Sequence, residues 1–115
     1  MLPKVNRLKK KNDFERVFKE GKRYILSSGE LYLKIIKNNL KNSRFGFVVS
    51  KKFSKKATIR NRIKRRLREV IKIGLPKVKK GIDGIIVVRR DLDAKNFREL
   101  EEKINKLFRK AGIIE

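Results

Sequence analysis

An uninterrupted apolar run, from Ile85 to Val88, is the feature that most restricts how this chain folds. A strand with one face in water alternates apolar and polar residues, whereas a continuous apolar run is typical of a central strand covered on both faces. Two other segments are typical of strands. Leu31 to Lys37 alternates, which predicts one buried face, and Phe45 to Ser50 is apolar and β-branched. A fourth, shorter strand is predicted from Tyr24 to Leu26.

Three helices accompany these strands. Asn12 and Glu15 have the positions of a capping box, and they predict a short helix that ends at Gly21. Apolar residues spaced by three or four predict longer helices from Thr58 to Ile73 and from Phe97 to Ala111. In the first of these two, the predicted core stripe consists of Ile59, Ile63, Leu67, Val70 and Ile71.

The order helix, strand, strand, strand, helix, strand, helix predicts an α+β protein. We expect a small mixed four-stranded sheet with three helices, of the split β-α-β type. The chain has no internal repeat and no low-complexity linker, and its two prolines lie outside the periodic segments. We therefore expect a single domain over residues 1–115, a length at which one hydrophobic core is common.

The charge of the chain restricts its partners. Thirty-five Lys and Arg residues stand against 12 Asp and Glu, a formal net charge of +23. Self-repulsion of that size destabilises a compact state, so a polyanionic partner is expected, and nucleic acid fits best because Lys and Arg displace counterions from its phosphates. An acidic membrane is the rival polyanion. However, no run of 18 apolar residues exists and the basic N-terminus lacks the apolar stretch of a signal peptide, so we expect a cytoplasmic protein.

No catalytic site is expected in this chain. Histidine and cysteine are both absent, which excludes disulfides, Cys/His zinc sites and histidine-based acid–base chemistry. Metal-assisted cleavage of a phosphodiester needs clustered carboxylates. Asp91 and Asp93 form a close pair, but they stand just before a predicted helix, where Asp is common as a turn or cap residue.

Positive charge concentrates around the helix predicted from Thr58 to Ile73. From Lys51 to Lys72 there are eleven Lys or Arg residues and one acid, Glu69. Like charges four residues apart destabilise a helix by about 0.2–0.5 kcal/mol per pair, a cost that an ordinary solvated face leaves unexplained. With Ile59 as the centre of the buried stripe, a helical wheel separates two polar groups. One flank carries Arg60, Lys64 and Arg68, whereas Asn61, Arg65 and Lys72 lie opposite the core and Arg62 lies on the other flank.

Aromatic residues are candidates for base stacking. Phe14 and Phe18 share one face of the predicted short helix, where a core role is equally expected. Tyr32 shares its strand face with Lys34, so that face is at least partly wet. Aromatic rings beside a basic groove stack unpaired bases, at about 1–3 kcal/mol each. The pair Lys51-Lys52 follows a strand and continues into the basic helix, which favours a phosphate contact.

The run from Arg60 to Glu69, RNRIKRRLRE, resembles the signature of the protein subunit of bacterial ribonuclease P. The resemblance covers nearly the whole chain. Gly84 departs from it, because the family more often has an apolar strand residue at that position, and this leaves the start of the last strand open. The matching positions outside the run are Arg7, Leu8, Phe14, Val17, Phe18, Gly21, Arg44, Gly46, Val49, Lys51, Lys52, Ala57, Asp83 and Arg89.

The resemblance implies a function and an unusual topology. In this family a large RNA uses bound Mg²⁺ ions to hydrolyse precursor tRNA and release its 5′ leader. The protein binds both this catalytic RNA and the single-stranded leader, and it has no active site of its own. The resemblance also implies a left-handed β-α-β crossover around the basic helix, although general rules favour a right-handed one.

The resemblance also implies a central cleft that holds the leader. Which residues contact the leader and which contact the catalytic RNA is a hypothesis based on their positions. No metal ligand in the protein and no obligate protein partner are expected. The main alternative function is that of a generic RNA-binding protein of the ribosomal type, without a role in processing. The residues expected to contact the leader are Phe14, Phe18, Tyr32, Arg60, Lys64 and Arg68, and those expected to contact the catalytic RNA are Asn61, Arg62, Arg65, Lys51 and Lys52.

Overall fold

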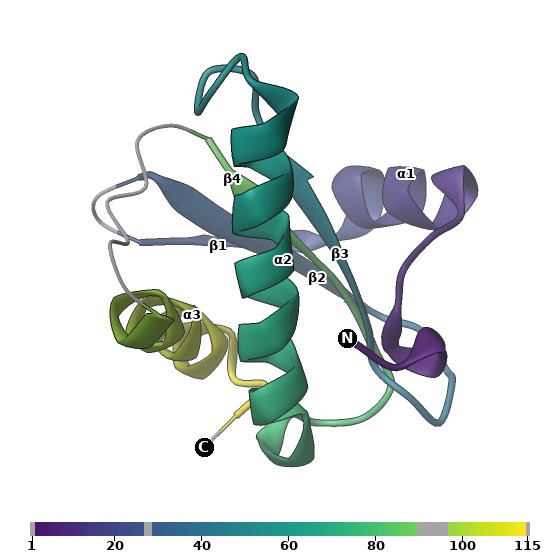
Figure 1. Cartoon of the computed structure of the whole chain (residues 1–115). Helices are drawn as coiled ribbons and strands as arrows, with labels where there is room; N and C mark the ends of the chain where they lie inside the picture. Colours follow the sequence, from purple (N-terminus) through teal and green to yellow (C-terminus); the bar gives the residue numbers. More distant parts are fainter. Residues whose placement is uncertain (1, 27–28, 90–96, 115) are drawn as a thin grey trace.

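The computed structural model describes residues 2–26, 29–89 and 97–114, so the Asp91 and Asp93 pair lies outside the described residues. The elements follow the predicted order and are labelled in Figure 1. They are α1 (Lys11–Glu20), β1 (Lys22–Ile25), β2 (Leu31–Lys37), β3 (Arg44–Val49), α2 (Ala57–Gly74), β4 (Ile82–Val88) and α3 (Phe97–Ala111), with short 3-10 turns at Lys4–Asn6 and Leu75–Lys77.

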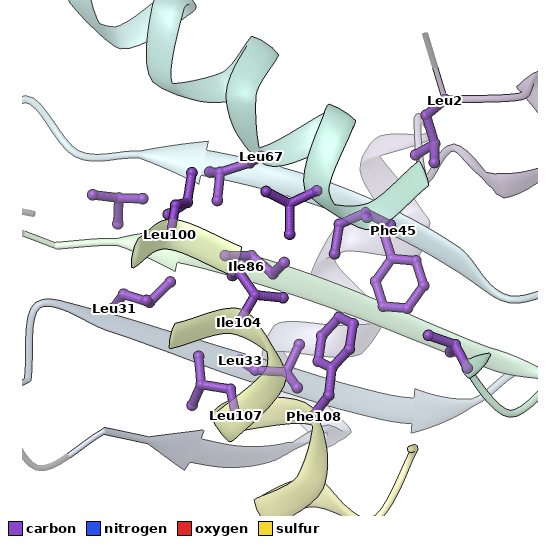
Figure 2. Packing of buried hydrophobic residues seen from close by; sticks show 14 of the residues in the cluster. Leu2, Leu31, Leu33, Phe45, Leu67, Ile86, Leu100, Ile104, Leu107 and Phe108 are labelled. Carbon is purple, nitrogen blue, oxygen red and sulfur yellow. The ribbon is translucent and has the colours of Figure 1, made fainter. Parts of the chain in front are cut away.

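The strands form one mixed sheet in the order β1-β2-β4-β3. β2 pairs antiparallel with β1 and with β4, whereas β3 runs parallel to its direct neighbour β4. Parallel neighbours need a long crossover, and α2 provides it. When β3 and β4 are turned to point upward with α2 toward the viewer, β4 lies to the left of β3 in both Figure 1 and Figure 2. The crossover is therefore left-handed, and the predicted α+β fold with a mixed four-stranded sheet and three helices is confirmed.

Two helices cover one face of the sheet. α2 and α3 pack side by side over it, and Figure 2 shows Leu67 of α2 and Ile104 of α3 above the sheet residues Leu33 and Ile86. All four side chains are at most 1% exposed. This layer holds the larger of two apolar clusters, and it fixes the side of α2 that faces away from solvent.

The third helix covers the opposite face. Val17 of α1 is buried in a smaller cluster with Ile85 and Val87 of β4. Because helices lie on both sides, every residue from Ile82 to Val88 is buried. The prediction that the continuous apolar run is a central strand covered on both faces is confirmed.

Some predicted details are wrong. The Phe14 N–H donates to the Lys10 carbonyl at 3.1 Å, so α1 begins at Lys11 and Asn12 lies inside the helix instead of capping it. Ile59 is 37% exposed, because the first turn of α2 projects beyond the end of β3 (Figure 1), and it does not belong to the core. β1 spans Lys22–Ile25, two residues earlier than predicted at its start. Within the described ranges, no helix has both the length and the apolar character needed to cross a bilayer.

Candidate nucleic-acid interface

A cleft of about 840 Å³ opens along the free edge of β3. Because β3 is the last strand of the sheet, α1 behind the sheet and α2 in front of it form the two walls (Figure 1). The lining residues come from four segments: Leu2, Arg7, Leu8 and Lys9 of the N-terminal stretch, Phe14 of α1, Phe45, Gly46 and Phe47 of β3, and Arg65, Arg68 and Glu69 of α2.

The N-terminal stretch is fixed beside β3. The Leu8 N–H donates to the Phe45 carbonyl at 3.0 Å, and Arg7 forms a parallel bridge with Phe45. Nε of Arg7 donates to the carbonyl of Leu2 at 2.6 Å, and the Leu2 side chain is buried in the core. The N–H and C=O groups of successive strand residues point to opposite sides of the strand. Since those of Phe45 point to the free edge, those of Phe47 do so as well. The cleft therefore includes strand backbone as well as side chains.

The wall formed by Phe14 depends on a glycine. A Cβ atom built on Gly46 would lie 2.4 Å from Cζ of Phe14, a separation that real atoms do not adopt. The aromatic ring thus lies directly on the backbone of β3. This contact brings an α1 side chain from behind the sheet to the edge where α2 also reaches.

Gly46→Ala is expected to push the Phe14 ring out of the cleft wall. The added methyl group overpacks the contact, and we expect a loss of about 1–3 kcal/mol in the free energy of unfolding, measured by urea titration. The matched control is Gly74→Ala at the end of α2, where a Cβ meets nothing within 4 Å. That change is expected to stabilise the protein by about 0.4–1 kcal/mol. Equal effects of the two substitutions would contradict the ring-on-backbone contact.

The cleft combines positive charge with aromatic surface. The guanidinium carbon of Arg68 lies 5.9 Å from the centre of the Phe47 ring, within the range of a cation–π contact. Arginine also binds phosphate in a bidentate manner, and the rings of Phe14 and Phe47 offer faces on which bases stack. Backbone and bases of a single-stranded nucleic acid therefore both find matching groups. The charged lining residues are the cations Arg7, Lys9, Arg65 and Arg68 and the acid Glu69.

Of the residues predicted to contact the leader, Phe14 and Arg68 line this cleft. Arg60 and Lys64 do not; both are half-buried on α2. Nη1 of Arg60 donates to the carbonyl of Ser54 at 2.8 Å, which ties its side chain to the loop before the helix. The predicted leader contacts on α2 are thus divided, because Arg68 lines the cleft whereas Arg60 and Lys64 do not.

The other predicted leader contacts are Phe18 of α1 and Tyr32 of β2, which lie in the same apolar cluster as Phe14. Each ring is half-buried and has a cation beside it. Nζ of Lys34 lies 6.0 Å from the centre of the Phe18 ring and also donates to the Phe18 carbonyl. Cζ of Arg23 lies 5.6 Å from the centre of the Tyr32 ring. The structure therefore places these two rings on a basic surface next to the cleft, outside its lining.

Most of the residues predicted to contact the catalytic RNA are exposed near the start of α2. Asn61 and Arg62 are exposed on α2, and Lys51 and Lys52 are exposed in the turn that precedes it. Arg65 is the exception, because it lines the cleft together with Arg68.

The helical wheel took Ile59 as the centre of the buried stripe of α2, and the structure shifts that centre. The buried residues of α2 are Ile63, Leu67, Val70 and Ile71, so the centre of the stripe is turned toward Arg60 and Lys64. Those two cations become half-buried as a result. The next cations around the helix, Arg68 and Arg65, then take the position beside the cleft.

A buried carboxylate ties together the elements around the cleft. The Asp83 side chain on β4 is fully buried. Oδ1 accepts hydrogen bonds from Nε of Arg44 and Nδ2 of Asn38, both at 2.8 Å. Oδ2 accepts from Nη2 of Arg44 at 2.6 Å and from Nη2 of Arg16 at 3.4 Å. One side chain therefore links β3 and α1, which carry the strand edge and the Phe14 wall, to the central strand.

The two main partners shift each other's pKa. Burial alone raises the pKa of Asp83, but the hydrogen bonds from Arg44 and Asn38 and the charges of Arg44 and Arg16 outweigh it, so the pKa is lowered. The hydrogen bond to Asp83 raises the pKa of Arg44 further. Both groups therefore stay charged near neutral pH.

The lowered pKa predicts a pH dependence of stability. A carboxylate with a lower pKa in the folded state stabilises that state fully above its unfolded pKa of about 3.9. This stabilisation is lost as the pH falls from the unfolded pKa through the lower pKa of the folded state. We expect the difference in urea midpoint between the wild type and Asp83→Asn to be constant from pH 7 to 5 and to narrow below about pH 4. A difference that stays constant down to pH 2 would contradict the shift.

Sequence comparisons point to one family. A family model described as Ribonuclease P matches residues 2–112. A ribonuclease P protein component from Synechocystis is 41% identical over 115 residues, covering 99% of this chain and 91% of that protein. The ribonuclease P protein component of Dictyoglomus turgidum is 38% identical, covering 98% of this chain and 94% of its own length.

Solved structures agree with these matches. The RNase P protein from Staphylococcus aureus superposes with a TM-score of 0.84 at 26% identity, covering 97% of this chain and 100% of that one. The RNase P protein from Thermotoga maritima superposes with a TM-score of 0.80 at 33% identity, covering 90% of this chain and 96% of that one. The likeness therefore extends from sequence to fold over nearly all of both chains.

A small mixed sheet, a left-handed crossover through a cation-rich helix and an aromatic, basic cleft at the sheet edge define an α+β protein suited to binding a nucleic-acid strand. The sequence matches make this class specific. The chain belongs to the ribonuclease P protein family.

Proposed function

We propose that this chain is the protein component of a ribonuclease P ribonucleoprotein and assists its catalytic RNA in removing the 5′ leader from precursor tRNA. The chain contributes binding and positioning, and the RNA contributes the chemistry. The observation that carries the proposal is the cleft at the β3 edge, where four cations and the rings of Phe14 and Phe47 lie along the strand. The protein acts in the cytoplasm, where tRNA precursors are made.

The leader lies in the cleft. An unpaired strand exposes both its phosphates and the faces of its bases, whereas a duplex hides the faces. Arg65 and Arg68 bind the phosphates, and Phe14 and Phe47 stack against bases. The half-buried rings of Phe18 on α1 and Tyr32 on β2, each beside a cation, extend this path between α1 and the sheet.

The catalytic RNA contacts the outer surface around the start of α2. Asn61, Arg62 and Lys51-Lys52 are all exposed there, and the amide of Asn61 both donates and accepts hydrogen bonds. α2 separates this surface from the cleft while it contributes to both. One rigid helix therefore sets the position of the leader relative to the catalytic RNA, which is how a non-catalytic subunit improves catalysis.

Where the metal ions of the reaction are held is also part of the proposal. Among residues 2–26, 29–89 and 97–114, no three His, Cys, Asp or Glu side chains gather as metal ligands would. We assign Mg²⁺ to the catalytic RNA. The surplus positive charge of the chain lowers the repulsion between two polyanions, the catalytic RNA and the precursor, and so reduces the Mg²⁺ that their association requires.

Precursor tRNA cleavage by a bacterial ribonuclease P RNA tests the proposal. At low Mg²⁺ we expect cleavage with the chain present and little without it. The gain in substrate affinity is expected to be large for a precursor with a leader of about eight nucleotides and small for a leader of one, because only the longer strand reaches the cleft. An equal gain for both leaders would contradict the leader site. If the chain purifies from cells with ribosomal particles and without the catalytic RNA, the generic RNA-binding alternative is favoured.

A further inference from the structure

We propose that a second cavity, lined by β1, β2, the start of β4 and the end of α3, binds one unpaired nucleotide of the catalytic RNA. The inference rests on the proposed function only in taking that RNA as the partner. The cavity has a volume of about 410 Å³ and lies beside β1, next to the end of α3. None of the predicted RNA-contacting residues lines it.

The floor of this cavity is apolar. Ile35 of β2 and Ile82 of β4 form it, and Ala111 and Ile113 at the end of α3 form a wall. Its volume falls in the range of about 300–1,000 Å³ that is typical of small-molecule sites. An apolar floor of this size suits the flat face of a base or a ribose, and it does not suit a bare phosphate.

The rim of the cavity is positively charged. It carries Lys22 of β1, Lys37 of β2, and Lys79 and Lys80 before β4, and no acid lines the cavity. Nζ of Lys22 lies 5.4 Å from the centre of the Tyr24 ring, which also lines the cavity. In the described part of the chain, the other three ammonium groups have no carboxylate partner. Four cations around an apolar floor match a ligand that joins an aromatic ring to a phosphate.

The cavity is held in shape by the folded chain. Gly112 has a φ of +74° and ends α3, and the Ile113 N–H donates to the Phe108 carbonyl at 3.1 Å. The Lys79 N–H donates to the Ile113 carbonyl at 2.9 Å, which fixes the lysine-bearing segment against the end of α3. A Cβ on Gly112 would meet no atom within 4 Å, so the rim is open at this point. The site is therefore formed before a ligand binds, and little of the protein chain has to become ordered on binding.

The position of the cavity favours the catalytic RNA over the leader. β1 and β3 are the two edges of the sheet, with β2 and β4 between them. The proposed leader path along Phe14, Phe18 and Tyr32 follows the face of the sheet that α1 covers, whereas the second cavity lies on the face that α3 covers. A large folded RNA surrounds a small domain and reaches both edges, so the second cavity anchors that RNA at a distance from α2.

Charge-removing variants test this assignment. Lys79→Gln combined with Lys80→Gln removes two rim cations, and Lys106→Gln combined with Arg109→Gln removes two exposed cations from α3 outside the cavity. We expect the rim variant to weaken binding of the catalytic RNA alone about tenfold and to lower the slope of log Kd against log salt by about 1–2, with much smaller changes for the α3 variant. Equal effects of the two variants would overturn the proposal.

A mononucleotide tests the site directly. Adenosine 5′-monophosphate is expected to shift the amide resonances of Ile35, Gly112 and Ile113 in the wild type and not in the rim variant. Inorganic phosphate at the same concentration is expected to shift them much less. Equal shifts with phosphate, or no shifts, would overturn nucleotide binding. If the rim variant binds the catalytic RNA normally but loses leader affinity, the assignment to the catalytic RNA is overturned. Wild-type cleavage at low Mg²⁺ reports on the proposed function separately from all these outcomes.

Discussion

Asp83→Asn is expected to lower the free energy of unfolding by about 3–5 kcal/mol, the usual cost of removing one partner from a buried ion pair. The substitution keeps the size of the side chain but removes the charge that Arg44 and Arg16 neutralise. Arg44, only 22% exposed, then keeps a weaker partner in Asp13 at 3.4 Å. A loss of this size is a large part of the stability of about 5–15 kcal/mol that is typical of a small domain. Urea unfolding at pH 7 measures it.

Asp13→Asn is the matched control for this prediction. Asp13 contacts the same arginine, but its side chain is 25% exposed and its contact is longer, at 3.4 Å against 2.6 Å. We expect a cost of at most about 1 kcal/mol, as for other solvent-accessible ion pairs. If both substitutions cost the same, burial of Asp83 is not the source of its contribution.

Arg65→Ala combined with Arg68→Ala is expected to weaken leader binding by about 2 kcal/mol, or about thirtyfold in Kd. In the proposed complex each arginine supplies a charge-assisted contact to a phosphate of the leader. Both side chains are exposed, so we expect stability to change by less than about 0.5 kcal/mol. The measurement compares the affinity of the holoenzyme for precursors with long and short leaders. The loss should be confined to the long leader.

The control for this pair is Arg66→Ala combined with Lys72→Ala. These residues are exposed on the same helix and carry the same charge, but they do not line the cleft. A general electrostatic effect would weaken leader binding equally in both double variants. Such an outcome would mean that the position of Arg65 and Arg68 does not matter and would refute the cleft as the leader site.

The fold could be predicted where one element's own pattern decides it, and not where distant residues decide it. The apolar run from Ile85 to Val88 identified the central strand, but β4 begins three residues earlier, at Ile82. Asp83 opposes strand formation by its charge, and only partners such as Arg44, 39 residues away, neutralise it. Gly84 lies in the strand because the Phe45 ring packs on it; a Cβ there would be 2.9 Å from Cε1 of that ring. Neither contact is visible in a local pattern.

The candidate site was predicted in part for the same reason. The concentration of cations on α2 and the exposure of its outer side follow from the sequence, and Phe14 and Arg68 were found from it. Phe47 was missed, since alternation pairs it with the buried Phe45 and suggests a core residue. The available signal was its place on a strand that leads directly into the basic helix. Arg7 joins the cleft only because the N-terminal stretch pairs with β3, a contact between distant segments.

The cleft-lining residues are spread over the sequence from Leu2 to Glu69, and they meet only in the folded chain. An unfolded chain has no such cleft, so RNA that binds there favours the native state through mass action. At a free RNA concentration one hundred times Kd, the gain is about 2.7 kcal/mol. For a chain with a net charge of +23, the nucleic acid is therefore a thermodynamic partner in folding. The protein is at its least stable when it has been released from RNA.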